Sequence, residues 1–149
     1  MIAIGSDHGG YELKQFVMKH LDELGVAYKD YGTDSPESCD YPIYAEAVAR
    51  AVVSGEVEKG ILICGTGIGI GIAANKVQGI RAALCGDCYS AEFTRRHNDA
   101  NVLAMGARVT GSGLACKIVD TFLATEFEGG RHANRVALIS DIEKREREK

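Results

Sequence analysis

A cysteine placed directly before a glycine-rich loop is the feature of the sequence that points most clearly to chemistry. Cys64 ends the apolar run 60–64 and is followed by glycines at four alternate positions: Gly65, Gly67, Gly69 and Gly71. Such a loop, between a buried strand and a helical segment at 72–76, lets backbone N–H groups converge on an anion. The same N–H groups favour a thiolate over a thiol. Cys64 is therefore a candidate base or nucleophile beside an anion site.

The loop differs from the better-known phosphate-binding and nucleophile patterns. The dinucleotide fingerprint would need glycine where the chain has Ile70, and no Gly-Lys-Ser/Thr follows as in a P-loop. An acyl-transfer elbow would need glycine where Leu62 stands, which disfavours nucleophilic hydrolysis. Two simpler interpretations stay open: the glycines only let the helix approach the sheet, or Cys64 is a small core residue.

Polar side chains also follow the first apolar run, 1–5, where Asp7 and His8 lie. An adjacent acid and imidazole could transfer protons or hold a small polar ligand. Alternatively, Asp7 caps the helix that starts near Gly10. Either interpretation puts both side chains at the carboxyl end of a strand.

His97 and Asn98 precede the apolar run 102–105 and so belong to the opposite edge of the sheet from Cys64. If His97 takes part in the same chemistry as Cys64, it must come from a second subunit. The alternative is a polar turn between a helix and a strand.

Three arginines are candidates for binding a phosphate. Arg131 and Arg135 are four residues apart and share one helix face, and Arg108 lies just beyond the run 102–105. Guanidinium groups suit phosphate because its oxygens accept paired donors. A solvated helix face explains Arg131 and Arg135 equally well. The lone Cys85-x-x-Cys88 pattern has no second pair, so a zinc or redox role is disfavoured.

Five short apolar runs alternate with helical patterns along the chain. The predicted strands are 1–5, 26–31, 60–64, 80–85 and 102–105, and the helical patterns include 13–24, 44–53 and 114–123. Apolar strands joined by helices predict a five-stranded parallel sheet covered on both faces, a three-layer, doubly wound α/β domain of Rossmann-like type. If the strand order begins 2-1-3, the loops after the first and third strands face each other where such sheets bind ligands.

Length and composition limit the possible classes of function. The 149 residues fit one domain, 1–149, with a helix over 131–146 and a charged tail that looks solvated or frayed. With 17 basic and 21 acidic residues, the net charge of −4 leaves no basic surplus for nucleic acid. Five cysteines, an odd number, indicate reduced thiols and the cytoplasm. Without a signal-peptide pattern or an 18-residue apolar stretch, no membrane association is expected.

The motifs together resemble those of B-type ribose-5-phosphate isomerases, in a group that includes galactose-6-phosphate and allose-6-phosphate isomerases. The resemblance covers nearly the whole chain and rests on six motifs in order: 5–10 (GSDHGG), 40–42 (DYP), 64–69 (CGTGIG), 73–76 (AANK), 97–99 (HND) and 128–132 (EGGRH), followed by Arg135. It implies a cofactor-free and metal-independent aldose–ketose isomerisation that interconverts ribose 5-phosphate and ribulose 5-phosphate. The placement of His97 at the edge opposite Cys64 predicts a homodimer with active sites shared between subunits, and a tetramer is the larger alternative.

By this resemblance, Cys64 is the base that moves a proton between C1 and C2 through an enediolate. The developing oxyanion would be stabilised by Thr66 and the backbone N–H groups of Gly65, Gly67, Ile68 and Gly69. His97 would be the acid that opens the furanose ring, assisted by Asp7 and Thr66. The other pocket residues would be Asn98 for sugar hydroxyls, Tyr41 as a lining residue, and His8, Arg108, Arg131 and Arg135 for the phosphate.

Two positions of the loop distinguish branches of this group. One branch lacks the cysteine and uses a glutamate six positions later, where this chain has Ile70, so the resemblance favours Cys64 as base. Many relatives carry serine where this chain has Gly71. The missing side chain suggests a looser pocket that admits six-carbon substrates.

Two other classes of function remain as alternatives. A non-catalytic sugar-phosphate or nucleotide sensor would explain the glycine loop and the arginines but would give Cys64 and His97 no task. A flavin or nucleotide redox domain is disfavoured because the dinucleotide fingerprint is missing.

Overall fold

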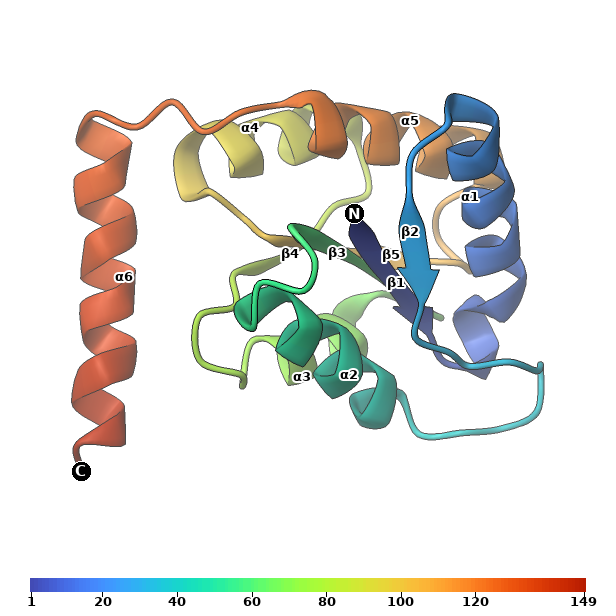
Figure 1. Cartoon of the computed structure of the whole chain (residues 1–149), viewed down its shortest axis with the longest axis horizontal. Coiled ribbons are helices and arrows are strands. Elements are labelled where there is room, and N and C mark those ends of the chain that lie inside the picture. Colours follow the sequence, from blue (N-terminus) through green and yellow to red (C-terminus); the bar gives the residue numbers. More distant parts are fainter.

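The computed structural model describes residues 1–149, which form one parallel sheet with helices around it (Figure 1). The strands are β1 (Ile2–Ser6), β2 (Tyr28–Asp30), β3 (Lys59–Cys64), β4 (Ala82–Leu84) and β5 (Val102–Gly106). The helices are the 3₁₀ turn η1 (His8–Gly10), α1 (Tyr11–Leu24), α2 (Tyr41–Val53), α3 (Ile68–Ala74), α4 (Cys88–Asn98), α5 (Ser112–Ala124) and α6 (Arg131–Arg147).

The strand order is β2-β1-β3-β5-β4, and all neighbouring strands are parallel. Helices α2 and α3 cover one face of the sheet, and α1, α4 and α5 cover the other (Figure 1). Alternate side chains of β3 enter the two cores: Ile61 and Ile63 pack with α1 and α5, whereas Leu62 packs with α2. The predicted doubly wound α/β fold and the 2-1-3 start of the strand order are confirmed.

Most elements follow from local sequence signals. Helix α1 buries the stripe Leu13, Val17 and Leu21 and ends at Gly25, whose φ of 71° closes the helix in the left-handed region. Helix α4 carries no such stripe, and its buried side chains are Ala91 and Arg95. Apolar periodicity therefore gave no signal for α4, although Asp87 caps it by accepting a hydrogen bond from the Ser90 N–H at 2.6 Å.

The element boundaries differ from the predictions at the sheet edges and at the tail. Strands β2 and β4 are three residues each, shorter than the predicted 26–31 and 80–85, and each pairs with only one neighbouring strand. The charged tail, expected to be solvated or frayed, is exposed but continues as helix α6 to Arg147.

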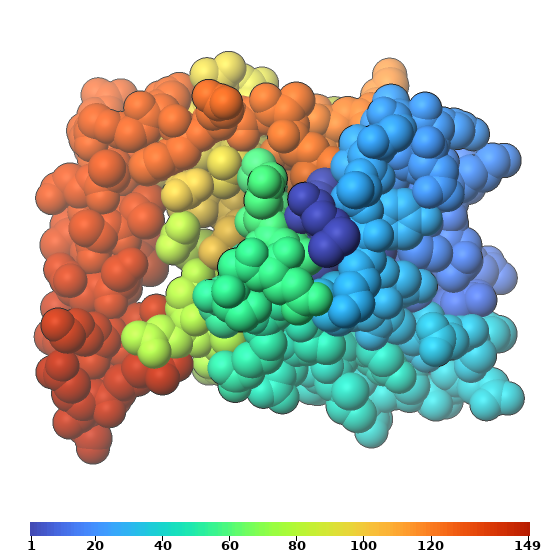
Figure 2. Space-filling view, in the orientation of Figure 1, coloured from blue at the N-terminus to red at the C-terminus, as the bar shows by residue number.

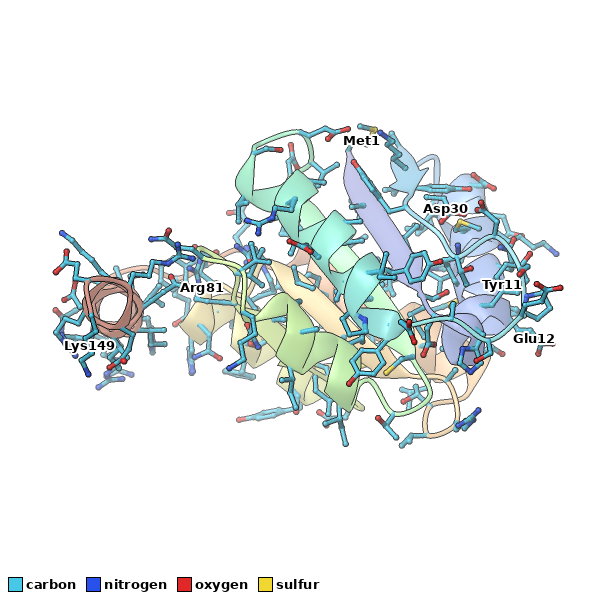
Figure 3. All side chains as sticks on the ribbon, turned by 90° about the horizontal axis from the view of Figure 1, so that it is seen from below. Met1, Tyr11, Glu12, Asp30, Arg81 and Lys149 are labelled. Atoms are coloured by element: carbon cyan, nitrogen blue, oxygen red, sulfur yellow. The ribbon has the colours of Figure 1, made fainter.

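Helix α6 stands away from the rest of the chain. Figure 2 shows a hollow between this helix and the body, and Figure 3 shows α6 end on beside the body. A cleft of about 770 Å³ lies there, lined by residues of α6 and of the loops around β4. The Glu143 carboxylate accepts a hydrogen bond from the Gly79 N–H across this cleft. No helix of the structure combines the length and the apolar character that crossing a membrane would need.

A buried lysine holds the loop after β2 in place. The ammonium group of Lys14, a fully buried side chain, pairs with Asp30 Oδ1 at 2.6 Å and donates to the Thr33 carbonyl at 2.7 Å. The same Asp30 oxygen accepts from the Gly32 N–H. The loop 30–33 is also fixed beside the end of β1, because the Ser6 N–H donates to the Gly32 carbonyl and the Thr33 N–H donates to the Ser6 carbonyl.

We expect Lys14→Met to lower the free energy of unfolding by about 2–4 kcal/mol, because it leaves a partly buried carboxylate and a buried carbonyl without their partner. Urea denaturation measures the change. Lys19→Met on the exposed face of the same helix is the matched control and should be near neutral. Equal stability of the Lys14 and Lys19 variants would show that the buried pair contributes nothing.

Candidate active site

Cys64 lies at the carboxyl end of β3 with its side chain beneath the glycine loop. Its Sγ accepts a hydrogen bond from the Gly67 N–H at 3.1 Å, and only 5% of the residue is exposed. This contact fixes the direction of the sulfur relative to the loop. The loop is tied to the end of β5 by the Ala107 and Arg108 N–H groups, which donate to the carbonyls of Cys64 and Gly65. The thiol is thus held in one position against a rigid backbone.

The loop after β1 packs directly on the glycine loop. A Cβ added at Gly9 would lie 3.3 Å from the Gly65 nitrogen. Asp7 is buried, and its Oδ1 accepts a hydrogen bond from the Gly10 N–H at 3.1 Å, so the capping interpretation is confirmed. The cap occupies one carboxylate oxygen. The strand order therefore brings the two polar loops together, as expected for a switch point.

His8 is oriented by a backbone group from a distant segment. The Cys39 N–H donates to His8 Nδ1 at 3.2 Å. Because Nδ1 accepts, the neutral ring carries its proton on Nε2, where it can be donated to an anionic ligand.

Tyr41 and Arg108 border the glycine loop. A Cβ added at Gly69 would lie 2.8 Å from Tyr41 Cζ, and one added at Gly65 would lie 3.1 Å from Arg108 Nη1. Arg108 forms no ion pair within the chain. Its free guanidinium and the loop N–H groups make this edge of an acidic protein suitable for an anion. Thr66 and Ile68 are exposed on the same loop.

Gly67 is the position where the loop depends most on glycine. Its φ is 80°, and an added Cβ would lie 2.7 Å from the Met105 carbonyl carbon. If the loop N–H groups stabilise an oxyanion, as the resemblance implies, Gly67→Ala should reduce kcat/KM by about a hundredfold, because oxyanion donors are each typically worth 10²–10³ in rate. Gly111→Ala, where an added Cβ meets nothing within 4 Å, is the matched control. Equal kcat/KM in the two variants would contradict a role for the loop geometry.

The remaining predicted residues form a second group at the other end of the sheet. His97 and Asn98 end α4 before β5 begins, and the His97 ring stacks on the His132 ring with centroids 4.1 Å apart. Arg131 and Arg135 lie on α6 beside His132. Five strand residues, roughly 15 Å at about 3.3 Å each, separate this edge from the one that carries Cys64.

The structure therefore does not join all the predicted residues within one chain. The distant placement of His97 agrees with the expectation from sequence. Arg131 and Arg135, expected to hold a phosphate with His8 and Arg108, lie beside His97 within one chain. Any site that uses both groups needs two copies of the chain.

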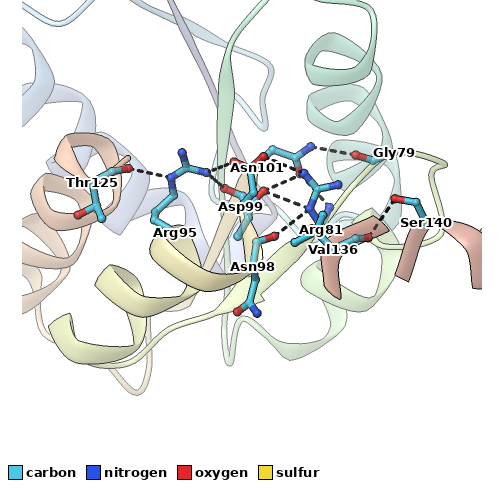
Figure 4. Close-up of polar contacts among 10 residues, drawn as sticks. Gly79, Arg81, Arg95, Asn98, Asp99, Asn101, Thr125, Val136 and Ser140 are labelled. Carbon is cyan, nitrogen blue, oxygen red and sulfur yellow. Dashed lines mark hydrogen bonds and ion pairs between the residues drawn. The ribbon is translucent and has the colours of Figure 1, made fainter. Parts of the chain in front are cut away.

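Hydrogen bonds fix the turn that follows His97 (Figure 4). The Arg81 guanidinium donates to the carbonyls of Asn98 and Asp99, and Arg95 donates to Asp99 Oδ1 at 2.9 Å. Asp99 adopts a φ of 47° and closes α4. The last turn of α4, with His97 on it, is therefore rigidly oriented.

Two residues beside His97, Glu128 and His132, belong to the 128–132 motif but were assigned no role from the sequence. Glu128 Oε1 lies 3.4 Å from His132 Nε2 and 3.9 Å from His97 Nε2. The only indication of this contact in the sequence is that Glu128 and His132 are four residues apart. That spacing brings two side chains together only if a helical turn follows the two glycines. Burial, His97 and Arg131 lower the pKa of His132.

The cluster of His97, Glu128 and His132 has the composition of a metal site, with ligand atoms within 4.8 Å of one another. A metal bound by two imidazoles must lie close to both ring planes. These planes are 11° from parallel and stacked, so they share no such point. Arg131 and Arg135 add positive charge beside the cluster. The stacked rings and the two arginines therefore do not suit a metal ion at this cluster.

The two branch-specific positions of the loop face the sheet. Ile70 is fully buried in the core shared with α2, so an apolar side chain fills the place of the alternative glutamate. A Cβ added at Gly71 would point at Ala104 Cβ, 3.4 Å away on β5. This direction gives no support to the expectation that a serine at 71 would line the pocket.

The other cysteines lack the setting of Cys64. All five are free, and burial raises the pKa of Cys85 to about 11. A thiol that stays protonated is a poor redox or metal-binding group. The raised pKa therefore agrees with the expectation that the Cys85-x-x-Cys88 pattern has no zinc or redox role.

The fold is that of a doubly wound α/β protein whose two polar loops meet at the switch point of its sheet. Residues 2–139 match the ribose/galactose isomerase family. The chain is 57% identical over 144 residues to ribose-5-phosphate isomerase B of Escherichia coli strain K12, covering 97% of both chains. It is also similar to the solved ribose-5-phosphate isomerase B structures of Clostridium thermocellum (58% identity, TM-score 0.95, 97% of both chains) and Thermotoga maritima (50%, 0.92, 94% of this chain and 97% of that chain). The chain belongs to the ribose/galactose isomerase family.

Proposed function

We propose that the chain interconverts ribose 5-phosphate and ribulose 5-phosphate through an enediolate. The observation that carries the proposal is the Cys64 thiol held by the Gly67 N–H beneath an anion-binding loop. The names of the E. coli, C. thermocellum and T. maritima relatives support the substrate pair.

In the proton-transfer step, the Cys64 thiolate takes the proton from C2 of the open-chain aldose. The electron pair moves onto the C1 oxygen, and the resulting enediolate is stabilised by the loop N–H groups and the Thr66 hydroxyl. The proton of the C2 hydroxyl passes to the C1 oxygen, and the Cys64 thiol returns a proton to C1, which leaves a carbonyl at C2 and gives the ketose. This route uses protein groups alone and calls for no cofactor or metal.

Ring opening comes before proton transfer, because ribose 5-phosphate binds as a furanose. We assign the acid to His97 of the partner subunit, which protonates the ring oxygen while Asp7 and Thr66 assist at the anomeric hydroxyl. Asn98 of the partner subunit would bind sugar hydroxyls. Tyr41 would line the pocket.

The phosphate would lie between the two groups of cationic residues. His8 and the unpaired Arg108 come from the chain that supplies Cys64, and the partner's Arg131 and the partner's Arg135 come from the other copy. Bidentate guanidinium contacts give both affinity and orientation.

A homodimer follows from this arrangement, and the exposed helix α6 supports it. Leu138, Ile139 and Ile142 are each about half exposed on this helix, beside the cleft that separates it from the body. A second copy that covers these side chains would bring its own strand-end loops towards the histidine group. A tetramer of such dimers is the larger alternative, and the five free cysteines fit a cytoplasmic location.

The choice of sugar is tested with the chain purified alone. A relative from Pectobacterium atrosepticum, 46% identical over 147 residues, is named D-erythrulose-4-phosphate isomerase. We expect the highest kcat/KM for ribose 5-phosphate among ribose 5-phosphate, allose 6-phosphate, galactose 6-phosphate and erythrose 4-phosphate. A higher kcat/KM for another sugar phosphate would reassign the substrate, and binding without turnover would favour a sensor.

A further inference from the structure

Glu128 joins two histidines and an arginine that come from separate helices. Its Oε1 faces the His97 and His132 rings, and its Oε2 lies 3.4 Å from Arg96 Nη1. The Glu128 backbone N–H donates to the Arg96 carbonyl at 3.1 Å. Both ends of the residue are therefore anchored to the last turn of α4, and its carboxylate is directed at the histidine pair.

The stacked rings cannot both carry a charge without strong repulsion at 4.1 Å. His132 is the more buried of the two, with 8% of its side chain exposed against 39% for His97. Burial lowers the pKa of His132, so charge is disfavoured on that ring, and His97 is the ring of the pair that is open to solvent. Phe93 packs against the His97 ring in an edge arrangement, with centroids 5.0 Å apart, and further restricts that ring.

The charged groups around the pair set the balance of protonation. Arg131 and Arg135 on α6 oppose a positive charge on His132, whereas Arg96 on α4 is paired with Glu92 and Glu128. Glu128 is the only acidic group in contact with either ring. Its carboxylate is therefore what makes a protonated imidazole tolerable beside two arginines.

We propose that Glu128 is a positioning residue that orients the stacked His97–His132 pair and keeps one proton on it, ready for ring opening. The inference rests on the proposed function, in which His97 opens the ring. Glu128 itself touches no substrate atom in this scheme and acts through His97. A purely structural link between α4 and α6 is the competing explanation, since Glu128 also connects these helices.

The test replaces the charge and keeps the shape. Glu128→Gln should lower kcat for ribose 5-phosphate by about tenfold, a fraction of the 10²–10⁴ typical of general acid catalysis, and should leave KM within about twofold. The alkaline limb of the kcat profile should move to lower pH, because the protonated ring loses its counter-charge. Glu128→Asp keeps the charge and should recover part of kcat. Glu126→Gln, exposed on the same loop, is the matched control and should behave as wild type.

An NMR titration of the histidine ring protons gives a readout that does not depend on activity. In wild type the pair should take up one proton, and in Glu128→Gln that uptake should move to lower pH. Unchanged kcat, pH profile of kcat and NMR titration in Glu128→Gln would overturn the inference. A lower melting temperature with no change in the pH profile of kcat or in the NMR titration would overturn it as well. Failure of wild type to convert ribose 5-phosphate would instead overturn the proposed function, and the titration would still report on the pair.

Discussion

Cys64→Ala is expected to lower kcat for ribose 5-phosphate by at least about a thousandfold, within the range observed when a general base is removed. No other ionisable side chain occupies the loop, because Ile70 fills the neighbouring buried position. Ligand binding should survive, since the loop N–H groups, His8 and Arg108 remain. Titration of the variant with ribose 5-phosphate, followed by calorimetry, measures the affinity separately from turnover.

Cys116→Ala is the control for this prediction. Cys116 is also a buried free cysteine, but it lies on α5 and not beside the glycine loop. Its variant should keep near-normal kcat. A Cys64→Ala enzyme with more than about a tenth of wild-type kcat would exclude Cys64 as the base that general base catalysis requires.

The second large effect is recovery of activity in mixed dimers. Cys64→Ala and His97→Asn should each be nearly inactive alone. Because Cys64 and His97 lie at opposite edges of the sheet, a heterodimer of the two variants should contain one intact site. Co-expression with two different affinity tags and sequential purification should give about half of wild-type activity per dimer.

The pairing of variants also supplies its own control. A heterodimer of Cys64→Ala with Gly67→Ala places both changes in the same group of residues, so neither site is repaired. It should stay inactive. Absence of activity in the Cys64→Ala and His97→Asn heterodimer would contradict a shared site, as would a monomer with full activity at the assay concentration.

The fold class was predictable because buried parallel strands leave short, unbroken apolar runs. The strands β1, β3 and β5 were predicted within one residue at each end, since both faces of these strands are buried. The edge strands were overpredicted, because apolar residues such as Val26 and Ile80 pack outside the sheet ladder. Helix α4 was missed because Arg95 takes a position where a periodic pattern would need an apolar residue.

The sequence could predict those residues of the candidate site that directly follow the ends of strands. Cys64 and Asp7 could be placed because their loops leave neighbouring parallel strands on the same edge. The contact of His97 with His132 could not be predicted, since it depends on how α6 starts after two glycines with φ values of 70° and 58°. For the same reason the sequence did not reveal that Arg131 and Arg135 lie with His97.

The most direct test is a time course of the purified, chelator-treated wild-type chain with ribose 5-phosphate in D₂O, followed by NMR. The proposed proton transfer through an enediolate predicts that ribulose 5-phosphate accumulates to equilibrium and that solvent deuterium enters at C1. No conversion of ribose 5-phosphate under these conditions would contradict the central claim.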